Sequence, residues 1–200
     1  MTSAEIWIKP VTLEGRFVRL EPLEPRHYAG LFGTLEPQEL RFIAPPTYWA
    51  ADSPGEFIGN VAWPTNRIPF AVVLRKTGEV VGCTSFFDAN KSNRSVEIGG
   101  TWIHSSQHGG ATNPEMKLLM LEHAFETRGA IRVQFKTHHE NLRSQQAITK
   151  LGAIREGTLR NHVIYPDGSR RHSVFFSILD SEWPEVRARL LERLAKSYEF

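Results

Sequence analysis

The stretch from Ser95 to Thr137 constrains the fold of this chain more than any other part of the sequence. Apolar residues follow a strand-like pattern over 95–103 (SVEIGGTWI), recur at helical spacing over 113–128, and alternate again over 131–137 (IRVQFKT). A period of two residues indicates a strand, and a period of about 3.6 indicates a helix. The pattern therefore predicts a strand–helix–strand crossover in the middle of the chain.

The rest of the chain adds strands and short helices around this crossover. Strands are predicted at 15–23, on both sides of a turn at 76–79, and in a second hairpin joined across 166–169. Helices are predicted at 25–35, at 141–152 with Asn141 as N-cap and Gly152 after the last turn, and at 181–197. Residues 37–67 show no clean period and are expected to form loops around one or two short helices. We expect one α+β domain over 1–200, with a mixed, largely antiparallel sheet, a single crossover and a core over about 13–180.

Composition excludes several classes of protein. The chain is 40% hydrophobic, which is enough for a packed core. Its net charge is +2, and the sequence contains no run of five like charges. Both observations argue against nucleic acid or a membrane surface as partner. Cys83 is the only cysteine, so a disulfide within the chain and a cysteine-cluster metal site are excluded, and its strand-like context predicts burial. No apolar run has the length of a signal peptide core or a membrane span, so we expect a soluble cytoplasmic protein. His138 and His139 should point to opposite faces if extended, and no metal site is expected.

The segment HGGATNPEMK, from His108 to Lys117, admits two interpretations. Free backbone N–H groups and the positive end of the helix dipole would suit a phosphate, and Gly109 and Gly110 would allow it to approach closely. Alternatively, the loop is an ordinary strand-to-helix turn, with Asn113 as cap and Pro114 in the first turn. The spacing fits neither a P-loop nor the GxGxxG turn, so local sequence leaves both interpretations open. The paired Gly99–Gly100 inside the preceding strand predicts a bulge or a close approach by a ligand.

Three segments taken together resemble the GNAT N-acetyltransferases, and most closely their RimJ/RimL-like branch. They are TWIHSSQHGGATNPEMKLLML at 101–121, N-x-R-S at 141–144, and KLGAIREG at 150–157, within a resemblance that spans about 13–180. The resemblance implies the GNAT fold, with a central pair of splayed parallel strands, here 95–103 and 131–137, flanked by helices. It also implies that acetyl-CoA, or another acyl-CoA, binds between these strands and that the acyl group passes to a primary amine. No metal is implied.

The resemblance also assigns residues to the donor site. The pyrophosphate loop of the family, Gln/Arg-x-x-Gly-x-Gly/Ala, maps onto His108, Gly109, Gly110, Ala111, Thr112 and Asn113. His108 replaces Gln/Arg, Ala111 replaces glycine and Asn113 replaces Gly/Ala. The Cβ of Ala111 would narrow the approach of a phosphate if a positive φ were needed there. Further donor contacts are expected from Trp102, Ile103, Asn141 and Ser144.

Acetyl transfer needs a neutral amine and a proton for the departing thiolate. Ser144 is the candidate acid, since the resemblance places a serine of that role there and the residue lies on the buried stripe of its helix; the alternative is that it only helps to cap this helix. Two glutamates are candidate bases, Glu156 in preference to Glu97, although either could instead pair with an arginine.

The acceptor cannot be identified from the sequence, and both a peptide N-terminus and a small amine are compatible. The acceptor pocket is expected to come from 37–67 and from the hairpin at 157–175. Trp49, Phe57 and Trp63 in the first region fit an apolar acceptor, a dimer contact or core packing. The resemblance favours a homodimer. The alternative function is a GNAT-fold protein that binds a ligand without turnover.

Overall fold

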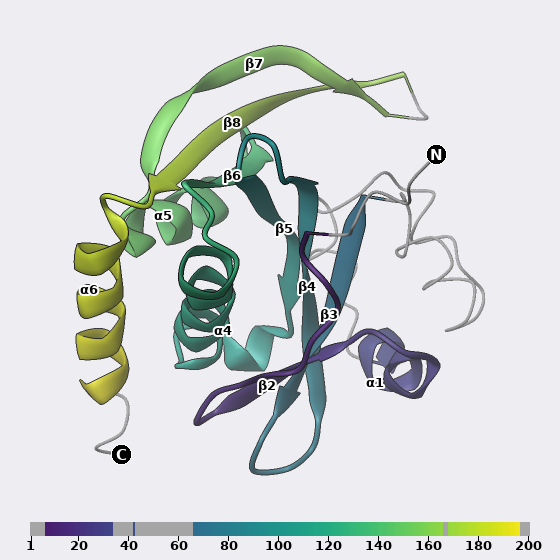
Figure 1. Ribbon diagram of the computed structural model, residues 1–200. Coiled ribbons are helices and arrows are strands. Elements are labelled where there is room, and N and C mark those ends of the chain that lie inside the picture. The colour runs from purple at the N-terminus through teal and green to yellow at the C-terminus, as the bar shows by residue number, and fades with distance from the viewer. Residues whose placement is uncertain (1–6, 34–41, 43–65, 166–167, 197–200) are drawn as a thin grey trace, which may run out of the picture.

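The structure is a computed structural model that describes residues 7–33, 42, 66–165 and 168–196 (Figure 1). Apart from residues 42, 66 and 67, the region 37–67 that was expected to form loops, with Trp49, Phe57 and Trp63, lies outside the described residues. The strands are β1 (Leu13–Glu14), β2 (Val18–Pro22), β3 (Arg67–Leu74), β4 (Val80–Asn90), β5 (Ser95–Ile103), β6 (Arg132–His138), β7 (Ile154–Ile164) and β8 (Arg170–Leu179). The helices are α1 (Tyr28–Gly33), α4 (Thr112–Glu122), α5 (Leu142–Leu151) and α6 (Trp183–Lys196), with 3-10 turns at Pro25–His27 and Ser105–Gln107.

The strands form one open sheet in the order β1-β2-β3-β4-β5-β6-β8-β7. All neighbours are antiparallel except β5 and β6, which run parallel on either side of the α4 crossover. The predicted fold class, a mixed and largely antiparallel sheet with one central parallel pair, is therefore confirmed.

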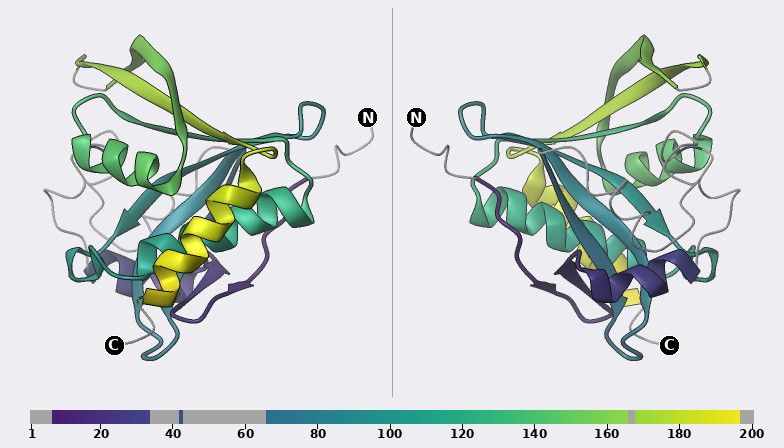
Figure 2. Two further views of the ribbon diagram at one scale, coloured as in Figure 1. Left: turned by 90° about the vertical axis from the view of Figure 1, so that its left-hand side faces the viewer. Right: turned by 90° about the vertical axis from the view of Figure 1, so that its right-hand side faces the viewer.

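The core lies between the sheet and the helices that cover one of its faces. Figures 1 and 2 show α4 and α6 on one side of the sheet and α1 on the other. The core residues of the helices include Met116, Met120 and Leu121 of α4, Ile148 and Leu151 of α5, and Val186, Leu190 and Leu194 of α6. Full burial of such a side chain contributes roughly 1.5–3 kcal/mol, so these apolar stripes fix the helices on the sheet. The helix predicted at 181–197 is thereby confirmed.

The predicted turns and caps appear where glycine and asparagine were expected to supply them. Gly78 has φ +75° in the β3–β4 hairpin, and Gly152 has φ +102° at the end of α5. The Asn141 side chain accepts a hydrogen bond of 3.0 Å from the backbone N–H of Ser144. These features can be predicted without long-range information, because a left-handed φ or a side-chain cap is a local property of the chain.

The bulge predicted in β5 is also present. Cys83 of β4 pairs with Trp102, and Ser85 pairs with Gly99, so two residues of β5 oppose one residue of β4. Gly100 is one of the two, with φ +55°, a conformation that favours glycine. The bulge lies in the middle of the strand that forms one side of the parallel pair.

Three details differ from the sequence prediction. β8 lies between β6 and β7, so α5 makes a second strand–helix–strand connection where one crossover was expected. The helix predicted over 113–128 begins at Thr112, with Ala111 as N-cap, and gives way at 123–127 to a π-helical turn. Pro114 fits the first turn all the same, because N–H groups there have no partner within the helix.

No helix within the described ranges is long and apolar enough to cross a membrane.

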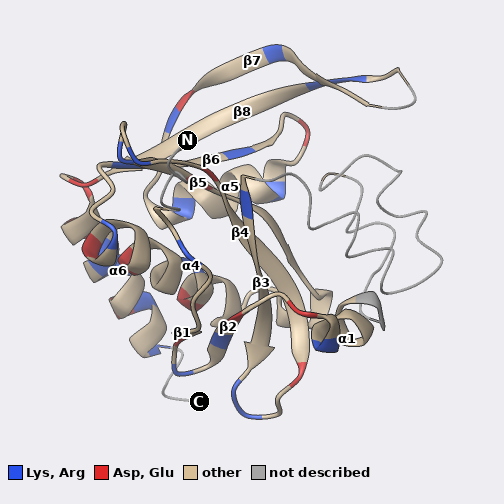
Figure 3. Cartoon of the chain, turned by 45° about the vertical axis from the view of Figure 1, so that its right-hand side comes forward, with Lys and Arg blue, Asp and Glu red and all other residues tan. Residues whose placement is uncertain are grey.

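Charged residues of both signs occupy the outer surface of the helices. Figure 3 shows basic and acidic segments interspersed along α6, where Glu185 pairs with Arg189 and Glu192 with Lys196 at i,i+4 spacing. Exposed pairs of this kind add little to stability, because solvent screens them. Their main consequence is a solvated outer face opposite the buried stripe.

Candidate functional site

The parallel strands β5 and β6 pair over a short distance and then separate. Their register joins Ser95 to Arg132, Val96 to Val133 and Glu97 to Gln134, and no pair follows. Beyond this point, no described strand pairs with the side of β5 that faces β6. Backbone N–H and C=O groups on a free edge seek partners, and an extended chain with amide groups can supply them. The opening is therefore suited to a ligand that lies along β5.

Glu97 occupies the point where the two strands part. Its carboxylate accepts a hydrogen bond of 3.0 Å from Gln134 Nε2 and lies 3.1 Å from Lys136 Nζ. The side chain is 1% exposed. A Cβ at Gly99 would stand 3.0 Å from Glu97 Oε1, so the carboxylate lies directly beside the bulge.

The same face of the bulge carries a second basic group. A Cβ at Gly100 would stand 3.0 Å from an Arg67 nitrogen and 3.2 Å from the Phe87 ring. Arg67 donates from Nε to Ser85 Oγ at 2.8 Å, and its guanidinium lies 5.0 Å from the Phe87 ring centroid. Glu97 and Arg67 thus place opposite charges next to the residues at which the backbone of β5 bends.

On the other face of the bulge, toward α4, lies a buried lysine that sequence reasoning missed. Lys117 Nζ donates to Thr101 Oγ1 at 2.6 Å, and the Thr101 hydroxyl is 2.8 Å from that of Thr84. Lys117 is 5% exposed. Burial lowers its pKa to about 7, against a smaller opposing effect of the Cys83 thiol. Cys83 is itself buried, as predicted, and burial raises its pKa.

The loop between β5 and α4 is fastened by its own side chains. His108 donates from Nε2 to the carbonyl of Ile103 at 3.0 Å and accepts at Nδ1 from Arg143 at 3.1 Å. These roles follow because a carbonyl can only accept and a guanidinium can only donate. Thr112 Oγ1 donates to Gln107 Oε1 at 3.0 Å. Both ring nitrogens of His108 are engaged, whereas Arg143, which sequence reasoning did not select, brings a cation to the loop.

The two glycines of this loop leave its backbone open. Gly109 has φ +78°, and a Cβ there would meet no atom of the described residues within 4 Å. Among the same residues, a Cβ at Gly110 would meet only the Gln107 carbonyl, at 3.7 Å. Ala111 has φ −77°, so its Cβ does not oppose a positive φ. The loop thus reaches α4 with free space around its backbone, as an anion at a helix N-terminus requires.

Ser144 lies in the first turn of α5, but its hydroxyl takes no part in the cap. Asn141 Oδ1 accepts from the backbone N–H of Ser144, and the Ser144 hydroxyl has no hydrogen-bond partner among the described residues. The interpretation of Ser144 as a capping side chain therefore loses support, and its assignment as the acid stays a prediction.

Glu156 is held by a bidentate salt bridge. Arg132 Nη1 and Nη2 each donate to its carboxylate at 2.6 Å, and Ser177 Oγ donates at 2.8 Å. The hydrogen bonds from Arg132 are the main cause that lowers the pKa of Glu156, although partial burial opposes them. A carboxylate so occupied is a weak proton acceptor.

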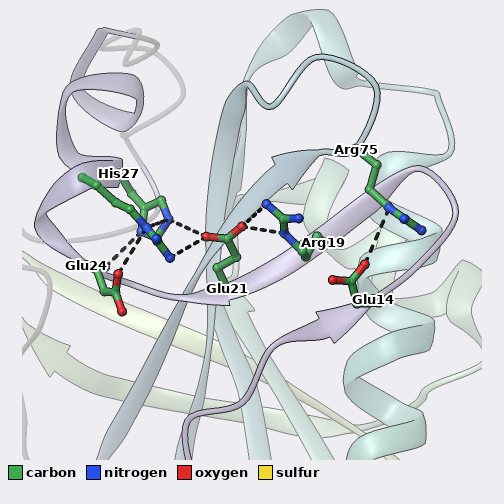
Figure 4. Close-up of polar contacts among 7 residues, drawn as sticks. Glu14, Arg19, Glu21, Glu24, His27 and Arg75 are labelled. Carbon is green, nitrogen blue, oxygen red and sulfur yellow. Dashed lines mark hydrogen bonds and ion pairs between the residues drawn. The ribbon is translucent and has the colours of Figure 1, made fainter.

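A separate groove of about 670 Å³ lies at the β1–β2–β3 edge of the sheet. Glu21 is among its lining residues, and Figure 4 shows the Glu21 side chain between Arg19 and His27. Arg26 also pairs with the Glu21 carboxylate. Burial alone would raise the pKa of Glu21, but these hydrogen bonds and charges outweigh it and the pKa is lowered. The cluster satisfies its own charges and is two strands away from the β5–β6 opening.

The histidine pair at the end of β6 differs from expectation. The rings of His138 and His139 are stacked, with centroids 4.4 Å apart, because His139 lies just beyond the last residue of the strand and is not held in its alternation. Within 7–33, 42, 66–165 and 168–196, no group of three His, Cys, Asp or Glu residues is arranged to hold a metal ion.

Comparisons with known proteins point to one family. The family profile described as the acetyltransferase (GNAT) domain matches residues 18–154. A candidate acetyltransferase from T. thermophilus is 38% identical, with a TM-score of 0.84 over 94% of this chain and 100% of its own. A GCN5-related N-acetyltransferase from Brucella melitensis is 27% identical, with a TM-score of 0.84 over 92% of this chain and 86% of its own. Mycobacterium smegmatis RimJ in complex with CoA-disulfide shares the fold at 24% identity, with a TM-score of 0.73 over 92% and 95%. Comparison with curated proteins gives no match.

Proposed function

Because this chain belongs to the GNAT acetyltransferase family, we propose that it transfers the acetyl group of acetyl-CoA to a primary amine, by direct attack in a ternary complex. The observation that carries the proposal is the parting of β5 and β6 beyond Glu97, beside a bulge at Gly100. This opening offers unpaired backbone to an amide-containing donor arm and puts a carboxylate where the arm would end.

The donor site we propose follows the residues assigned from the sequence. The pantetheine arm would lie along β5 past Trp102 and Ile103, and its amides would pair with the free backbone edge. The pyrophosphate would lie over Gly109 and Gly110 at the start of α4, where N–H groups and the helix dipole favour negative charge. The remaining donor contacts would come from His108, Ala111, Thr112, Asn113 and Asn141.

The chemistry at the reacting centre requires two proton movements. The amine nitrogen attacks the thioester carbonyl carbon, a C–N bond forms, and the C–S bond breaks. Glu97 would take the proton that the amine loses, directly or through a water molecule. We favour Glu97 over Glu156 in this role, because Glu97 lies where β5 and β6 part, beside the bulge, whereas a bidentate bridge from Arg132 and the Ser177 hydroxyl hold Glu156. The departing thiolate would receive a proton through the Ser144 hydroxyl, which would regain a proton from water as its own leaves.

Replacing Ser144 with alanine is expected to lower kcat roughly tenfold to a hundredfold with little change in the Kd of acetyl-CoA. The cap of α5 uses the backbone N–H of this residue, so the helix start survives the change. Steady-state kinetics and thermal melting check the expectation. An unaltered kcat would remove Ser144 from the mechanism.

The choice of acceptor sets how strongly a base is needed. An α-amine with a pKa of about 8 is about a tenth neutral at pH 7, whereas a lysine at about 10.4 is under ~0.1% neutral. We propose a peptide N-terminus or a small amine as acceptor, in keeping with the RimJ/RimL-like motifs at 141–144 and 150–157. The hairpin of β7 and β8, which carries Arg160, Arg170 and Arg171, would border the acceptor.

The proposed donor site is tested by calorimetric titration with acetyl-CoA. Asp and Asn tolerate a positive φ comparably, so Gly109→Asn controls for backbone strain while Gly109→Asp adds a charge at the phosphate position. We expect Gly109→Asp to bind about 10- to 100-fold more weakly than Gly109→Asn, since like charges this close repel by roughly 1–3 kcal/mol. Equal affinities would move the phosphates away from this loop. Binding by the wild type without transfer to any amine would instead favour the ligand-binding alternative.

A further inference from the structure

Lys117 is a buried cation that nothing in the described chain neutralises. Within the described part of the chain, no carboxylate lies within 4 Å of its Nζ, and its one hydrogen bond goes to Thr101. An ammonium group has three protons to donate, so two remain without an acceptor among the described residues. Burial of a charge in this state is costly unless a ligand or a proton loss relieves it.

The position of Lys117 connects it to the β5–β6 opening. It extends from the middle of α4 to Thr101, which lies on β5 immediately after Gly100. Its Nζ is also 5.9 Å from the ring centroid of Phe135. Phe135 follows Gln134, which is the last residue of β6 that pairs with β5. The amine therefore lies on the α4 face of the sheet, close to side chains of both strands at the level where they have separated.

The groups that face this amine leave it dependent on a ligand. β4 contributes the Cys83 thiol and the Thr84 hydroxyl, β5 the Thr101 hydroxyl, and β6 the ring of Phe135. Cys83 is the ionisable group among them, and it stays a neutral thiol because burial raises its pKa. Acceptor oxygens from a molecule in the opening would supply what these elements do not.

We propose that Lys117 is a positioning residue of the donor site, whose ammonium group donates hydrogen bonds to the carbonyl oxygens of the acyl-CoA arm that lies between β5 and β6. This inference rests on the proposed function, because it requires the donor in this opening. The donor arm would then contact Lys117 on the α4 side of the bulge. These contacts come in addition to the backbone edge of β5 and to Glu97 on the other side. The thioester arm is then held from both faces of the sheet.

A proton balance follows from this arrangement. Burial holds the pKa of Lys117 at about 7 in the free protein, and acceptor oxygens of the donor raise it in the complex. At about pH 8 the free amine is mostly neutral and the bound amine mostly protonated, so binding takes up close to one proton. At about pH 6 the amine is protonated in both states, and Lys117 contributes no uptake.

The test is calorimetric titration with acetyl-CoA at about pH 8 and about pH 6, in two buffers of different ionisation enthalpy. Phosphate groups of the donor also titrate, so the quantity to compare is the proton uptake of the wild type minus the proton uptake of Lys117→Met. We expect close to one extra proton taken up by the wild type at the higher pH and none at the lower, with binding about tenfold weaker in Lys117→Met. Lys117→Gln, which keeps a donor but no titration, should bind at intermediate strength without the uptake.

Lys150→Met is the matched control, since it removes an exposed lysine of α5 and should change neither affinity nor proton uptake. Circular dichroism verifies that each variant is folded. If Lys117→Met is not folded, Lys117→Gln replaces it in the comparison with the wild type. Wild-type binding with no difference from the Lys117 variants would overturn the inference and leave the proposed function intact. Failure of the wild type to bind would defeat the proposed function itself. Acetylation of Lys117 detected by mass spectrometry after incubation with acetyl-CoA would also overturn the inference, because the amine would then be an acceptor.

Discussion

Replacing Glu97 with glutamine is expected to lower kcat about 10²- to 10⁴-fold, with the Kd of acetyl-CoA changed little. Glutamine has the same shape but cannot take a proton. The wild-type carboxylate is 1% exposed, between Lys136 and Gln134 at the apex of the β5–β6 opening. Steady-state kinetics as a function of pH measures the effect. The loss should be greater with a lysine acceptor than with an α-amine, because fewer lysine side chains are neutral near pH 7.

Glu156→Gln is the matched control for this variant. It removes the other candidate base and weakens the half-exposed salt bridge to Arg132, for which we expect a small decrease in stability. Its kcat should stay within a few-fold of the wild-type value. If Glu156→Gln lost more activity than Glu97→Gln, the assignment of the base would have to be reversed.

Replacing Glu115 with alanine is expected to destabilise the protein by about 3–5 kcal/mol. The carboxylate is 2% exposed and accepts three backbone N–H groups, from Arg16, Phe17 and Val18, at 2.6–2.7 Å. Alanine would take this acceptor away from the buried N–H of Val18 and from the part-buried N–H groups of Arg16 and Phe17. The corresponding decrease in Tm is about 10 °C or more for a domain of this size.

Calorimetric or optical melting measures this change, and two variants calibrate it. Glu115→Gln keeps one acceptor oxygen and should lose about half as much. Glu122→Ala removes a partly exposed glutamate of the same helix that pairs with Arg187, and should cost at most about 1 kcal/mol. Equal Tm values for Glu115→Ala and Glu122→Ala would show that the contacts to 16–18 contribute little.

Local patterns accounted for much of the fold because they depend on neighbours in the sequence. Alternation gave the strands on both sides of α4, the paired glycines gave the bulge at Gly100, and Asn141 and Gly152 marked the ends of α5. The position of β8 between β6 and β7 could not be obtained this way. It depends on which edges pair, and the strand pattern of 170–179 is compatible with either neighbour.

Sequence motifs supplied part of the proposed site, whereas residues whose role depends on tertiary contacts were missed. The loop at 108–113 and the residues Asn141 and Ser144 came from motifs. The sequence favoured Glu156 over Glu97 as the base and could not indicate the Arg132–Glu156 salt bridge, because this bridge depends on the register of β6, β8 and β7. Lys117 was missed for a similar reason: within a helical pattern a lysine is assigned to the solvent face, and only packing against Thr101 shows that it is buried.

The order of the strands has a consequence for the way the chain is synthesised. When β7 emerges from the ribosome, its neighbour in the sheet does not yet exist, since β7 pairs with β8 and β8 pairs with β6. Until residue 179 has been made, one side of β6 is therefore an exposed edge that can pair with strands of other chains. Nascent chains that pause between β7 and β8 should be the species most prone to aggregate and the most dependent on chaperones.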